Sequence, residues 1–493
     1  MKIRIFCYLL FLFLGIYFAK FFPLLKIFFP VDHVEAVMFT INQKVTGSEN
    51  VIYTLFTKEL AASILDFILI TFLALSISFF LKKKTSLKKS SFIFTKTIFT
   101  FSATSLAIAI VTFFISFPVA KYIQTWYNYI KTPAHSELYI KEYIKPDSIS
   151  FPEQKKNLIL IFLESMETNF QDSAHGGNLS INRIPEITQY MLQNDNFKSG
   201  GLSVFGTNWT MAAVVSKTCG IPLNYPPGIY HSTDKIKNFL PHAICLTDVL
   251  KKNSYNILFA QGSDKEFASM GAFAQTHGNI PIHDYQYYQQ KYSLNQEKKE
   301  NWGISDRKIY DYSKEDIKKL NSKQPFAIII TTLDTHMPYG YMDPKCHYPE
   351  GKGAKELYPY ILECSSKLLD DFIQWAKSQP WYRNTVIAVM GDHETYVPPE
   401  AVGFKDTTIT HRWISFFINS SVQTDNFQRE YTSFDMYPTI LESIGATVPN
   451  HALGLGRSLY SNKATLLEKY GADSLNKLLG GRSIEYDYFL YTK

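Results

Sequence analysis

Three long apolar segments near the N-terminus constrain the architecture of this chain most strongly. They cover residues 3–29, 60–81 and 92–120, and each is near or above the ~20 residues that a helix needs to cross a bilayer. The first has an apolar stretch too long for a cleaved signal peptide, and no small-residue cleavage site follows it. We therefore expect residues 1–120 to form a membrane anchor with three transmembrane helices. Asp66 lies inside the second segment, where a carboxylate is a functional candidate but could equally reach the headgroups.

Positive charge gathers in the short loop between the second and third apolar segments. Basic loops remain on the cytoplasmic side of a membrane, and the N-terminus carries Lys2 and Arg4 on the same side. Three spans then place everything after Ala120 on the outer face. The net charge of +6 is modest and mostly local, which indicates membrane topology rather than nucleic-acid binding. The lysines of the loop are Lys82, Lys83, Lys84, Lys88, Lys89 and Lys96.

The sequence after residue 156 alternates between apolar runs and segments of helical periodicity. Such alternation predicts an α/β domain over residues 157–493, in which helices cover both faces of a mainly parallel sheet. The aromatic, lysine-bearing stretch 121–156 leads into this domain and indicates an interfacial linker, with an ordinary surface helix as the alternative. The expected strands cover 158–163, 256–260, 326–331, 385–390 and 413–418, and the expected helices include 185–193, 246–253 and 360–379.

Acidic and histidine side chains adjoin several of the predicted strands. In a parallel sheet, binding sites form beyond the carboxyl ends of the strands. Glu164 ends the first predicted strand, Asp334-Thr-His336 follows the third, and Gly391-Asp392-His393-Glu394 follows the fourth. His411 and Arg412 lie just before the last strand. One such side chain alone would be an ordinary loop charge, but several in one topological position indicate a functional site.

A loop rich in glycine and small polar residues runs into an apolar, alanine-bearing helix over Phe205–Gly220. Thr210 stands at the expected start of this helix, among unpaired backbone N–H groups and at the positive end of the helix dipole. That position suits an anion, or a side chain that must become an alkoxide. An ordinary threonine N-cap is the alternative interpretation.

Glu164, Asp392, His393 and the Thr210 oxygen together offer three oxygen ligands and one nitrogen ligand. This mixed set suits one divalent cation, manganese or zinc, and suits magnesium less because of the imidazole. A metal ion in contact with Thr210 would lower the pKa of the hydroxyl and hold it as a nucleophile. Three further side chains would stabilise charge on an incoming phosphate or donate a proton to a leaving alcohol, and two would complete the pocket. The first three are His336, His411 and Arg412, and the other two are Gln261 and Trp302.

Four of the five cysteines lie in the part of the chain expected outside the cytoplasm. Four cysteines allow three connectivities. In an oxidising compartment we expect nearest-neighbour pairing, Cys219 with Cys245 and Cys346 with Cys364. Four buried free thiols are the alternative. The fifth cysteine, Cys7, lies in the first apolar segment.

The motifs recur in the order found in the alkaline phosphatase/sulfatase superfamily, which this chain resembles. Within it, the chain is similar to the membrane-anchored phosphoglycerol transferases, including lipoteichoic acid synthases, and most similar to those that decorate osmoregulated periplasmic glucans. The similarity to the latter covers roughly residues 157–461, including the surroundings of the four outer cysteines. The stretches that carry it are Asn157–Glu164, Gly206–Gly220, Asp334–His336, Gly391–His393, Asp435–Leu441 and Gly454–Ser458.

The resemblance implies an enzyme in which the four ligands proposed above hold one metal ion and Thr210 is the nucleophile. A phosphoglycerol headgroup would pass from phosphatidylglycerol onto Thr210 and then to a hydroxyl of a periplasmic or cell-surface glycan. His336 takes the place of the family's substrate-side histidine. The protein would be a multi-pass protein of the bacterial inner membrane, with its catalytic domain on the periplasmic face.

Two departures bear on the details of this resemblance. Thr207 is an alternative nucleophile, and Thr210 is preferred because its distance to Gly220 matches the sulfatase-type nucleophile turn. Lipoteichoic acid synthases have a tryptophan and an arginine after the phenylalanine that matches Phe267, whereas Ala268-Ser269-Met270 follows here. The headgroup pocket must therefore be built differently, and the headgroup itself stays open.

Three rival functions make different demands on the sequence. A sulfatase needs a cysteine or serine within Cys/Ser-x-Pro-x-Arg, whereas Thr210 is followed by Met-Ala-Ala-Val, which argues against sulfatase activity. A phosphoethanolamine transferase, the main alternative, would use His336 and His411 on its substrate side, but the stretch around Thr210 lacks that family's Val-Pro-Cys run. A non-catalytic lipid-binding relative would be expected to have lost at least one of the four ligands, and all four are present.

Overall fold

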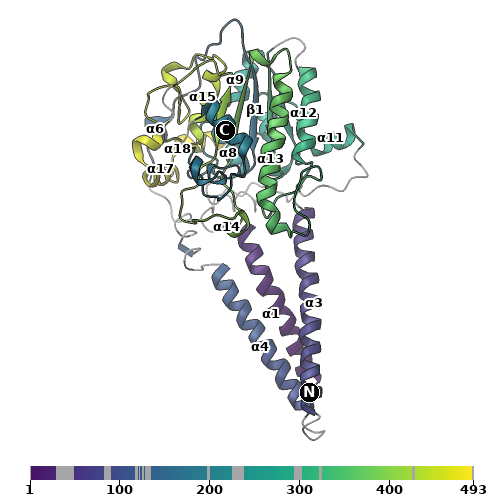
Figure 1. The fold of residues 1–493 in the computed structure, drawn as a ribbon. Coiled ribbons are helices and arrows are strands. Elements are labelled where there is room, and N and C mark those ends of the chain that lie inside the picture. Colours follow the sequence, from purple (N-terminus) through teal and green to yellow (C-terminus); the bar gives the residue numbers. More distant parts are fainter. Residues whose placement is uncertain are drawn as a thin grey trace. The chain divides into compact units, whose positions relative to one another are not determined.

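A computed structural model describes most of the chain (Figure 1). The described residues form two compact units, of which the first holds the three N-terminal helices and the second holds the chain from residue 135 onward. The description covers residues 2–28, 49–82, 90–116, 120, 123–124, 127, 135–196, 200–224, 238–293, 302–320, 325–424 and 428–490.

The helices of the first unit coincide with the three predicted membrane spans. Each contains a window that is long and apolar enough to cross a membrane, over Ile3–Pro23, Glu59–Ile77 and Phe94–Ser116. Residues 83–89 of the lysine-rich loop lie outside the described residues, so the orientation of the spans stays a prediction. The helices are α1 (Lys2–Phe28), α3 (Glu49–Lys82) and α4 (Ser90–Ser116).

Small and charged residues join these helices. Gly15 lets α1 and α4 approach closely, because a Cβ at this position would clash with Ser105 of α4. Asp66 of α3 forms an ion pair with Lys20 of α1, with 2.6 Å between Oδ2 and Nζ. A charge inside an apolar span is costly unless it is paired, and the ion pair with Lys20 lowers this cost for Asp66.

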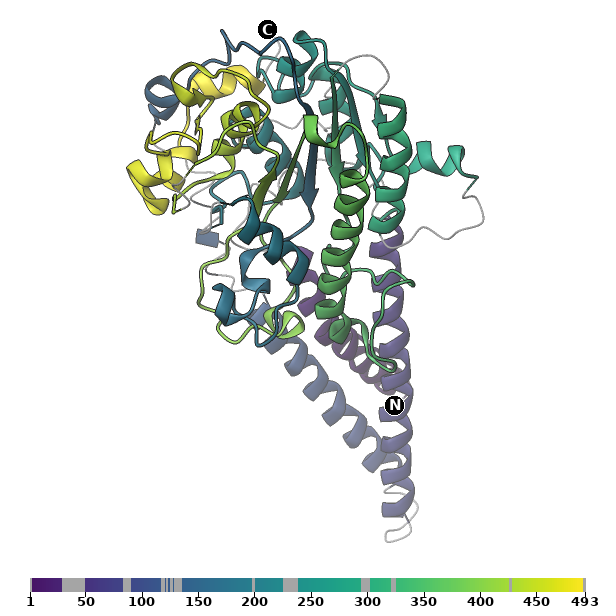
Figure 2. The ribbon, with the colours of Figure 1, turned by 45° about the horizontal axis from the view of Figure 1, so that its top comes forward.

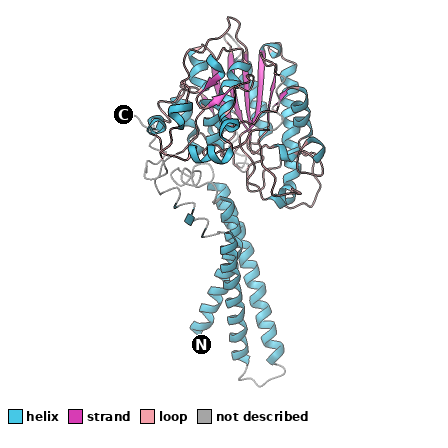
Figure 3. Cartoon of the chain, turned by 90° about the vertical axis from the view of Figure 1, so that its left-hand side faces the viewer, coloured by secondary structure: helices cyan, strands magenta, loops and turns pink. Residues whose placement is uncertain are grey.

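The second unit is built on a seven-stranded sheet, whose strands lie between helices in Figure 3. In spatial order they are β2 (Asp195–Asn196), β7 (Ser415–Ile418), β6 (Thr385–Gly391), β1 (Asn157–Leu163), β5 (Phe326–Thr331), β3 (Asn256–Gln261) and β4 (Ile282–His283). The five strands from β6 to β4 are parallel, as predicted. β7 runs antiparallel to β6, and β2 runs antiparallel to β7. The two-residue edge strands β2 and β4 are absent from the prediction because they are too short to show a period.

Helices cover both faces of the sheet, which confirms the predicted α/β class (Figures 1 and 2). On one side lie α8 (Thr210–Cys219), α9 (Leu246–Lys252) and α15 (Met436–Ser443), and on the other α7 (Pro185–Gln193), α12 (Asp306–Leu320) and α13 (Ala354–Lys377). The β1 side chains at positions 158, 160 and 162 belong to the first core and those at 159, 161 and 163 to the second. Burial on both faces explains why this strand is apolar at every position after Asn157.

Shorter elements complete the second unit around these layers. They are helices α6 (Leu138–Glu142), α10 (Met270–Thr276), α11 (Tyr285–Lys291), α14 (Pro399–Val402), α16 (Leu466–Tyr470), α17 (Ala472–Leu479) and α18 (Ile484–Leu490), and strands β8 (Ala452–Leu453) and β9 (Gly456–Arg457). The strand pair β8–β9 is antiparallel.

The second half of the predicted linker belongs to the globular unit. Tyr139 in α6 is 4% exposed, and its ring packs on Tyr486 of α18 with 5.2 Å between the centroids. Glu142 pairs with Arg457, with 3.0 Å between Oε2 and Nη2. Tyr139 therefore packs into the globular unit, and Tyr143 packs on Phe489 of α18 with 5.0 Å between the ring centroids, while the extent of an interfacial linker stays a prediction. Most of residues 121–134 lie outside the described residues.

Candidate active site

Glu164 and the Asp392–His393 pair meet at the carboxyl edge of the sheet. β1 ends at Leu163 and β6 ends at Gly391, and these two residues are partners in the parallel pairing of the strands. The residues that follow the two strands are therefore neighbours. Glycine is required at position 391, because a Cβ there would clash with the carbonyl oxygen of Met166.

Three of the predicted ligands form a compact buried cluster. His393 Nε2 lies 3.6 Å from Glu164 Oε1 and 3.4 Å from Asp392 Oδ2. One ligand atom from each residue lies within 4.8 Å of the other two, and all three side chains are buried. Two adjacent buried carboxylates cost free energy unless protons or a cation balance their charge.

The hydrogen bonds of this cluster leave its inward-facing atoms available. His393 Nδ1 donates to the carbonyl oxygen of Glu394 at 2.7 Å, which fixes the tautomer and leaves the Nε2 lone pair for a metal ion. Asp392 Oδ1 accepts from the backbone N–H groups of Ser165 and His393, both at 2.8 Å. Asp392 Oδ2 is buried and has no hydrogen-bond partner among the described residues. An unsatisfied carboxylate oxygen beside an imidazole lone pair fits a divalent cation such as zinc or manganese.

Glu164 is held by the residues that follow β5. Its backbone N–H donates to Thr332 Oγ1 at 2.9 Å, and its carbonyl oxygen accepts from Thr335 Oγ1 at 2.5 Å. Ser165 Oγ donates to Glu164 Oε1 at 2.6 Å. Burial and the neighbouring Asp392 raise the pKa of Glu164 to about 8. A bound cation would favour the ionised carboxylate and reverse this shift.

The hydroxyl of Thr210 faces the cluster. Thr210 is the first residue of α8 rather than its N-cap, so the interpretation as an ordinary N-cap does not hold. Its Oγ1 lies 3.3 Å from Glu164 Oε2 and 3.5 Å from His393 Nε2. Thr207 instead uses its hydroxyl in the preceding turn, where it donates to the Val204 carbonyl at 2.8 Å and accepts from the Val204 N–H at 2.9 Å. Of these two threonines, Thr210 therefore directs its hydroxyl at the cluster, and Thr207 does not.

Two predicted pocket residues, His336 and Trp302, lie against each other. Their ring centroids are 4.2 Å apart. Trp302 Nε1 and His336 Nδ1 both donate to the carbonyl oxygen of Met337, each at 2.9 Å, so His336 Nε2 carries the free lone pair in the neutral ring. Burial lowers the pKa of His336, which favours that neutral ring. Phe267 is 5.9 Å from Trp302 between centroids and extends the aromatic group.

His411 reaches the same edge of the sheet because β7 runs antiparallel to β6. In an antiparallel pair, the residues before one strand lie where its neighbour ends, and here Met390 pairs with Ser415. His411 Nδ1 donates to the carboxylate of Glu167, at 3.0 and 2.9 Å from its two oxygens. Glu167 is completely buried. Its hydrogen bond raises the pKa of His411 and therefore favours the imidazolium form.

Gln261 and Arg412, two further predicted pocket residues, both donate hydrogen bonds to groups of the protein, and their assignment to the phosphate pocket stays a prediction. The Gln261 amide donates to the carbonyl oxygens of Ser263 and Asp264 at 3.3 and 3.0 Å, and so braces its own loop. The Arg412 guanidinium donates to Glu430 at 2.6 Å. Arg412 also donates to the carbonyl oxygen of Gly200 at 3.2 Å.

Three supporting residues are absent from the predicted site. Ser165, with φ at 53°, adopts the left-handed region, and Glu167 lies in the same irregular turn, where no periodic pattern could reveal either. Lys217 is buried in α8, and burial lowers its pKa to about 7. A signal for Lys217 was available, because a lysine seven residues after Thr210 lies on the same face of a predominantly apolar helix.

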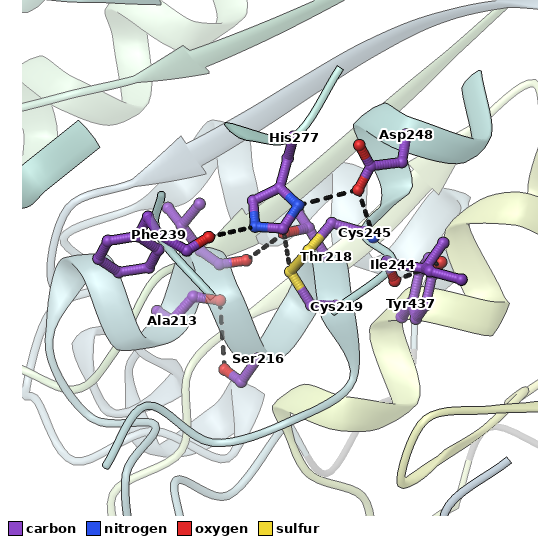
Figure 4. The surroundings of a disulfide bond; sticks show 11 residues. Ala213, Ser216, Thr218, Cys219, Phe239, Ile244, Cys245, Asp248, His277 and Tyr437 are labelled. Carbon is purple, nitrogen blue, oxygen red and sulfur yellow. Dashed lines mark hydrogen bonds and ion pairs between the residues drawn. A yellow bond between two sulfur atoms is a disulfide. The ribbon is translucent and has the colours of Figure 1, made fainter. Parts of the chain in front are cut away.

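The structure has the predicted nearest-neighbour cysteine pairs. Cys219–Cys245 joins the end of α8 to the start of α9 (Figure 4), and Cys346–Cys364 joins the loop after β5 to α13. The first bond anchors the C-terminal end of the helix whose N-terminal end presents Thr210. Cys7 is a free cysteine.

Sequence comparisons connect this chain to known proteins. A model of the family described as Sulfatase matches residues 156–446, more than half of the chain. A Phosphoglycerol transferase I of Xanthomonas campestris pv. campestris is 28% identical over 317 residues, which are 63% of this chain and 44% of the relative. A Phosphoglycerol transferase I of Citrobacter koseri is 28% identical over 350 residues, which are 68% of this chain and 43% of the relative. The match thus spans less than half the length of these curated relatives.

Solved structures also align with this chain. The lipoteichoic acid synthase LtaP from Listeria monocytogenes aligns with a TM-score of 0.48 and 18% identity, over 66% of this chain and 79% of that one. A protein in the alkaline phosphatase superfamily from Vibrio parahaemolyticus aligns with a TM-score of 0.48 and 21% identity, over 65% of this chain and 76% of that one. Both similarities are at low sequence identity.

Proposed function

This chain belongs to the sulfatase family, and we propose that it is a metal-dependent phosphotransferase. It moves a phosphoglycerol headgroup from phosphatidylglycerol to a hydroxyl of a periplasmic or cell-surface glycan, through a phosphate ester on Thr210. The observation that carries this proposal is the Thr210 hydroxyl, 3.3 Å from Glu164 Oε2 and 3.5 Å from His393 Nε2. A hydroxyl at a helix N-terminus, directed at a cluster of metal-binding side chains, is placed to become a nucleophile.

Glu164, Asp392, His393 and Thr210 would hold one divalent cation, manganese or zinc. When bound, such a cation lowers the pKa of a hydroxyl that it contacts and stabilises charge on the transferring phosphoryl group. The side chains fit this role because the two carboxylates balance a divalent charge. Their geometry fits as well, since Asp392 Oδ2 and His393 Nε2 are 3.4 Å apart and thus close enough to contact the same cation.

In the first displacement, the ionised Thr210 oxygen attacks the phosphorus of the lipid, and the bond from phosphorus to the diacylglycerol oxygen breaks. The departing oxygen needs a proton. His411 is suited to donate it, because the hydrogen bond that its Nδ1 donates to Glu167 favours the imidazolium form. Thr210 then carries the glycerol phosphate as an ester.

In the second displacement, a glycan hydroxyl attacks the same phosphorus and the Thr210 oxygen leaves. His411 has given up its proton in the first step and now accepts the proton of the attacking hydroxyl, so one residue serves as acid and then as base. The neutral ring of His336, with Trp302 beside it, would contact the headgroup during both steps. The cycle ends with His411 protonated and Thr210 free.

The curated relatives favour glycerol phosphate as the transferred group, since both are named phosphoglycerol transferases. Ethanolamine phosphate is the alternative, because Ala268-Ser269-Met270 follows Phe267 where lipoteichoic acid synthases have a tryptophan and an arginine. The three apolar helices suit an enzyme whose donor is a membrane lipid. We place the globular unit on the periplasmic side of a bacterial inner membrane, following the lysine distribution of the loop between the second and third spans.

The test is intact-protein mass spectrometry of the full chain after incubation with phosphatidylglycerol or phosphatidylethanolamine and manganese or zinc. We expect a mass increase of one glycerol phosphate from phosphatidylglycerol alone, mapped by peptide analysis to Thr210. The increase should be lost in Thr210→Ala and kept in the matched control Thr207→Ala.

Other outcomes would redirect or reject the proposal. An adduct from phosphatidylethanolamine alone would identify a phosphoethanolamine transferase. An adduct that survives in Thr210→Ala and is lost in Thr207→Ala would move the nucleophile to Thr207. No adduct from either lipid, together with no bound metal, would identify a non-catalytic relative.

A further inference from the structure

A buried lysine, Lys217, lies behind the metal-binding cluster. It follows Thr210 by seven residues on α8, and residues at this spacing lie on the same face of a helix, two turns apart. The Lys217 side chain is 0% exposed. Burying an ammonium group is costly unless its protons find acceptors, so the partners of Lys217 show what this position requires.

The ammonium group of Lys217 has a partner in each of three directions. Nζ donates to the carbonyl oxygen of Asp392 at 2.6 Å and to Ser433 Oγ at 3.0 Å. It also lies 3.9 Å from the centroid of the Trp413 ring, within the range of a cation–π interaction. These partners come from the turn after β6, the turn before α15 and the residues before β7. Lys217 thus joins α8 to three separate segments of the chain.

The bond to Asp392 matters most because of the atom that accepts it. Lys217 holds the backbone carbonyl of Asp392, while the N–H groups of Ser165 and His393 hold its carboxylate. The peptide that follows this carbonyl leads directly to His393. Hydrogen bonds to both the carbonyl and the carboxylate of Asp392 therefore fix the backbone at His393, and with it the position of the His393 ring. An apolar side chain could fill the same volume but could not donate this hydrogen bond.

We propose that Lys217 is a positioning residue that sets the location of the Asp392–His393 ligand pair relative to the nucleophile Thr210. The inference rests on the proposed function, since it assumes that the pair binds a metal ion. α8 carries Thr210 and Lys217 on one rigid element. A hydrogen bond from Lys217 to Asp392 therefore holds the nucleophile and two ligands in one frame.

The test is Lys217→Met, because methionine keeps much of the apolar stem and lacks the donors. Metal affinity of the full chain is measured by titrating manganese or zinc against a competing chelator, and kcat and KM for phosphatidylglycerol are measured at saturating metal. We expect metal affinity and kcat each to fall about 10–100-fold, as for other residues that orient metal ligands. KM should change less than about 2-fold, because Lys217 is completely buried and thus out of reach of a lipid headgroup.

A matched control removes a different buried cation. Arg457 pairs with Glu142 at 3.0 Å between Nη2 and Oε2, and both side chains are buried. Arg457→Met should lower the melting temperature and leave metal affinity and kcat unchanged. A loss of stability alone thus has a different signature from a loss of positioning.

Wild-type metal affinity together with wild-type kcat in folded Lys217→Met would overturn the inference. If that variant does not fold, Ser433→Ala is measured instead, because it removes one partner of Nζ and leaves the lysine in place. A several-fold loss of metal affinity in Ser433→Ala supports the role of Lys217, and an unchanged affinity overturns it. A wild-type chain that binds no metal would reject the proposed function as well, which separates the two failures.

Discussion

Two clusters in the globular unit consist of side chains that commonly bind metal ions. They differ in whether their ligand atoms already have partners in the protein. One consists of Glu164, Asp392 and His393, and the other of Cys245, Asp248 and His277. In each cluster, one ligand atom per residue lies within 4.8 Å of the other two. By distance alone, both would qualify as metal sites.

In the second cluster the ligand atoms already have partners (Figure 4). The sulfur of Cys245 is bonded to Cys219. His277 Nδ1 lies 2.9 Å from Asp248 Oδ2, and His277 Nε2 lies 2.9 Å from the carbonyl oxygen of Phe239. Asp248 Oδ2 also accepts from the Cys245 N–H at 2.9 Å, at the start of α9. These bonds hold α9 and its flanking loops together and leave no lone pair of His277 for a cation.

The first cluster is left incomplete by the chain itself. Its two carboxylates are adjacent and buried, and Asp392 Oδ2 lacks a hydrogen-bond partner within the described part of the structure. The His393 ring makes a short hydrogen bond through Nδ1, to the Glu394 carbonyl at 2.7 Å, whereas its Nε2 has Thr210 Oγ1 at the longer distance of 3.5 Å. Ligand atoms that lie close together therefore do not by themselves identify a metal site. The better criterion is whether those atoms still lack hydrogen-bond partners in the protein.

The largest expected effect is on transfer activity, with Asp392→Asn set against Asp248→Asn. Asp392→Asn should reduce transfer of labelled glycerol phosphate on the order of 10³-fold, because several kcal/mol of metal-dependent charge stabilisation is lost. Asp248→Asn should retain activity within about 2-fold at temperatures where it is folded. Similar losses in the two variants would contradict the assignment of the clusters.

The stability of the metal-free protein should respond in opposite directions. Asp392→Asn should raise the free energy of unfolding by about 1–3 kcal/mol, because it removes one of two adjacent buried charges. His277→Ala should lower it by about 2–3 kcal/mol, because the Phe239 carbonyl and the Asp248 carboxylate lose their donor. Urea denaturation of chelator-treated protein measures both. Destabilisation by Asp392→Asn would show that the first cluster is already satisfied without a metal ion.

The pH dependence of metal-free stability should depend on Glu164. Its pKa in the folded protein is raised from 4.5 to about 8, so the folded state favours the protonated form. The stability that this provides is present below the unfolded pKa and is lost as the pH rises through the folded pKa. The stability of the wild type relative to Glu164→Gln should therefore fall between about pH 5 and pH 8, and saturating manganese should abolish the trend. A constant difference across this range would contradict it.

The smallest change is expected in zinc stoichiometry when the Cys219–Cys245 bond is reduced. Reduction frees the Cys245 thiol beside Asp248 and His277, but the hydrogen bonds of these two residues remain. Bound zinc should stay at about one equivalent per chain, while the free energy of unfolding falls by ~3 kcal/mol for loss of a cross-link between residues 26 apart. Cys346→Ser/Cys364→Ser, with the first bond intact, is the control. A second equivalent of zinc after reduction would show that oxidation state, rather than hydrogen bonding, separates the clusters.

The central strands were predictable because their environment is uniform. β1, β5 and β6 are buried on both faces, so nearly every residue in them is apolar and the runs end where the chain leaves the sheet. The acidic and histidine residues that follow such runs are then visible as candidate ligands. Glu164 and the Asp392–His393 pair are found by this rule alone, and they form the buried cluster.

The position of His411 cannot be derived from this rule without knowing the direction of its strand in the sheet. The sequence places His411 before a strand, which in a wholly parallel sheet would put it at the edge opposite Glu164. It lies on the same side because β7 runs antiparallel to β6. An apolar run of four residues reads the same in either direction, so strand direction is set by pairing with β6 rather than by the run itself.

By itself, the sequence determined the three apolar spans, the parallel core of the sheet, the candidate ligands and the pairing of neighbouring cysteines, because each depends on composition, period or short spacing. Only the tertiary structure decided which polar groups are satisfied and which are free. The Gln261 amide has acceptors within three residues, whereas Glu167, Arg412 and Lys217 have partners 244, 212 and 175 residues away. A hydrogen bond needs its two atoms within about 3 Å, and no local pattern in the sequence records a distance between segments so far apart.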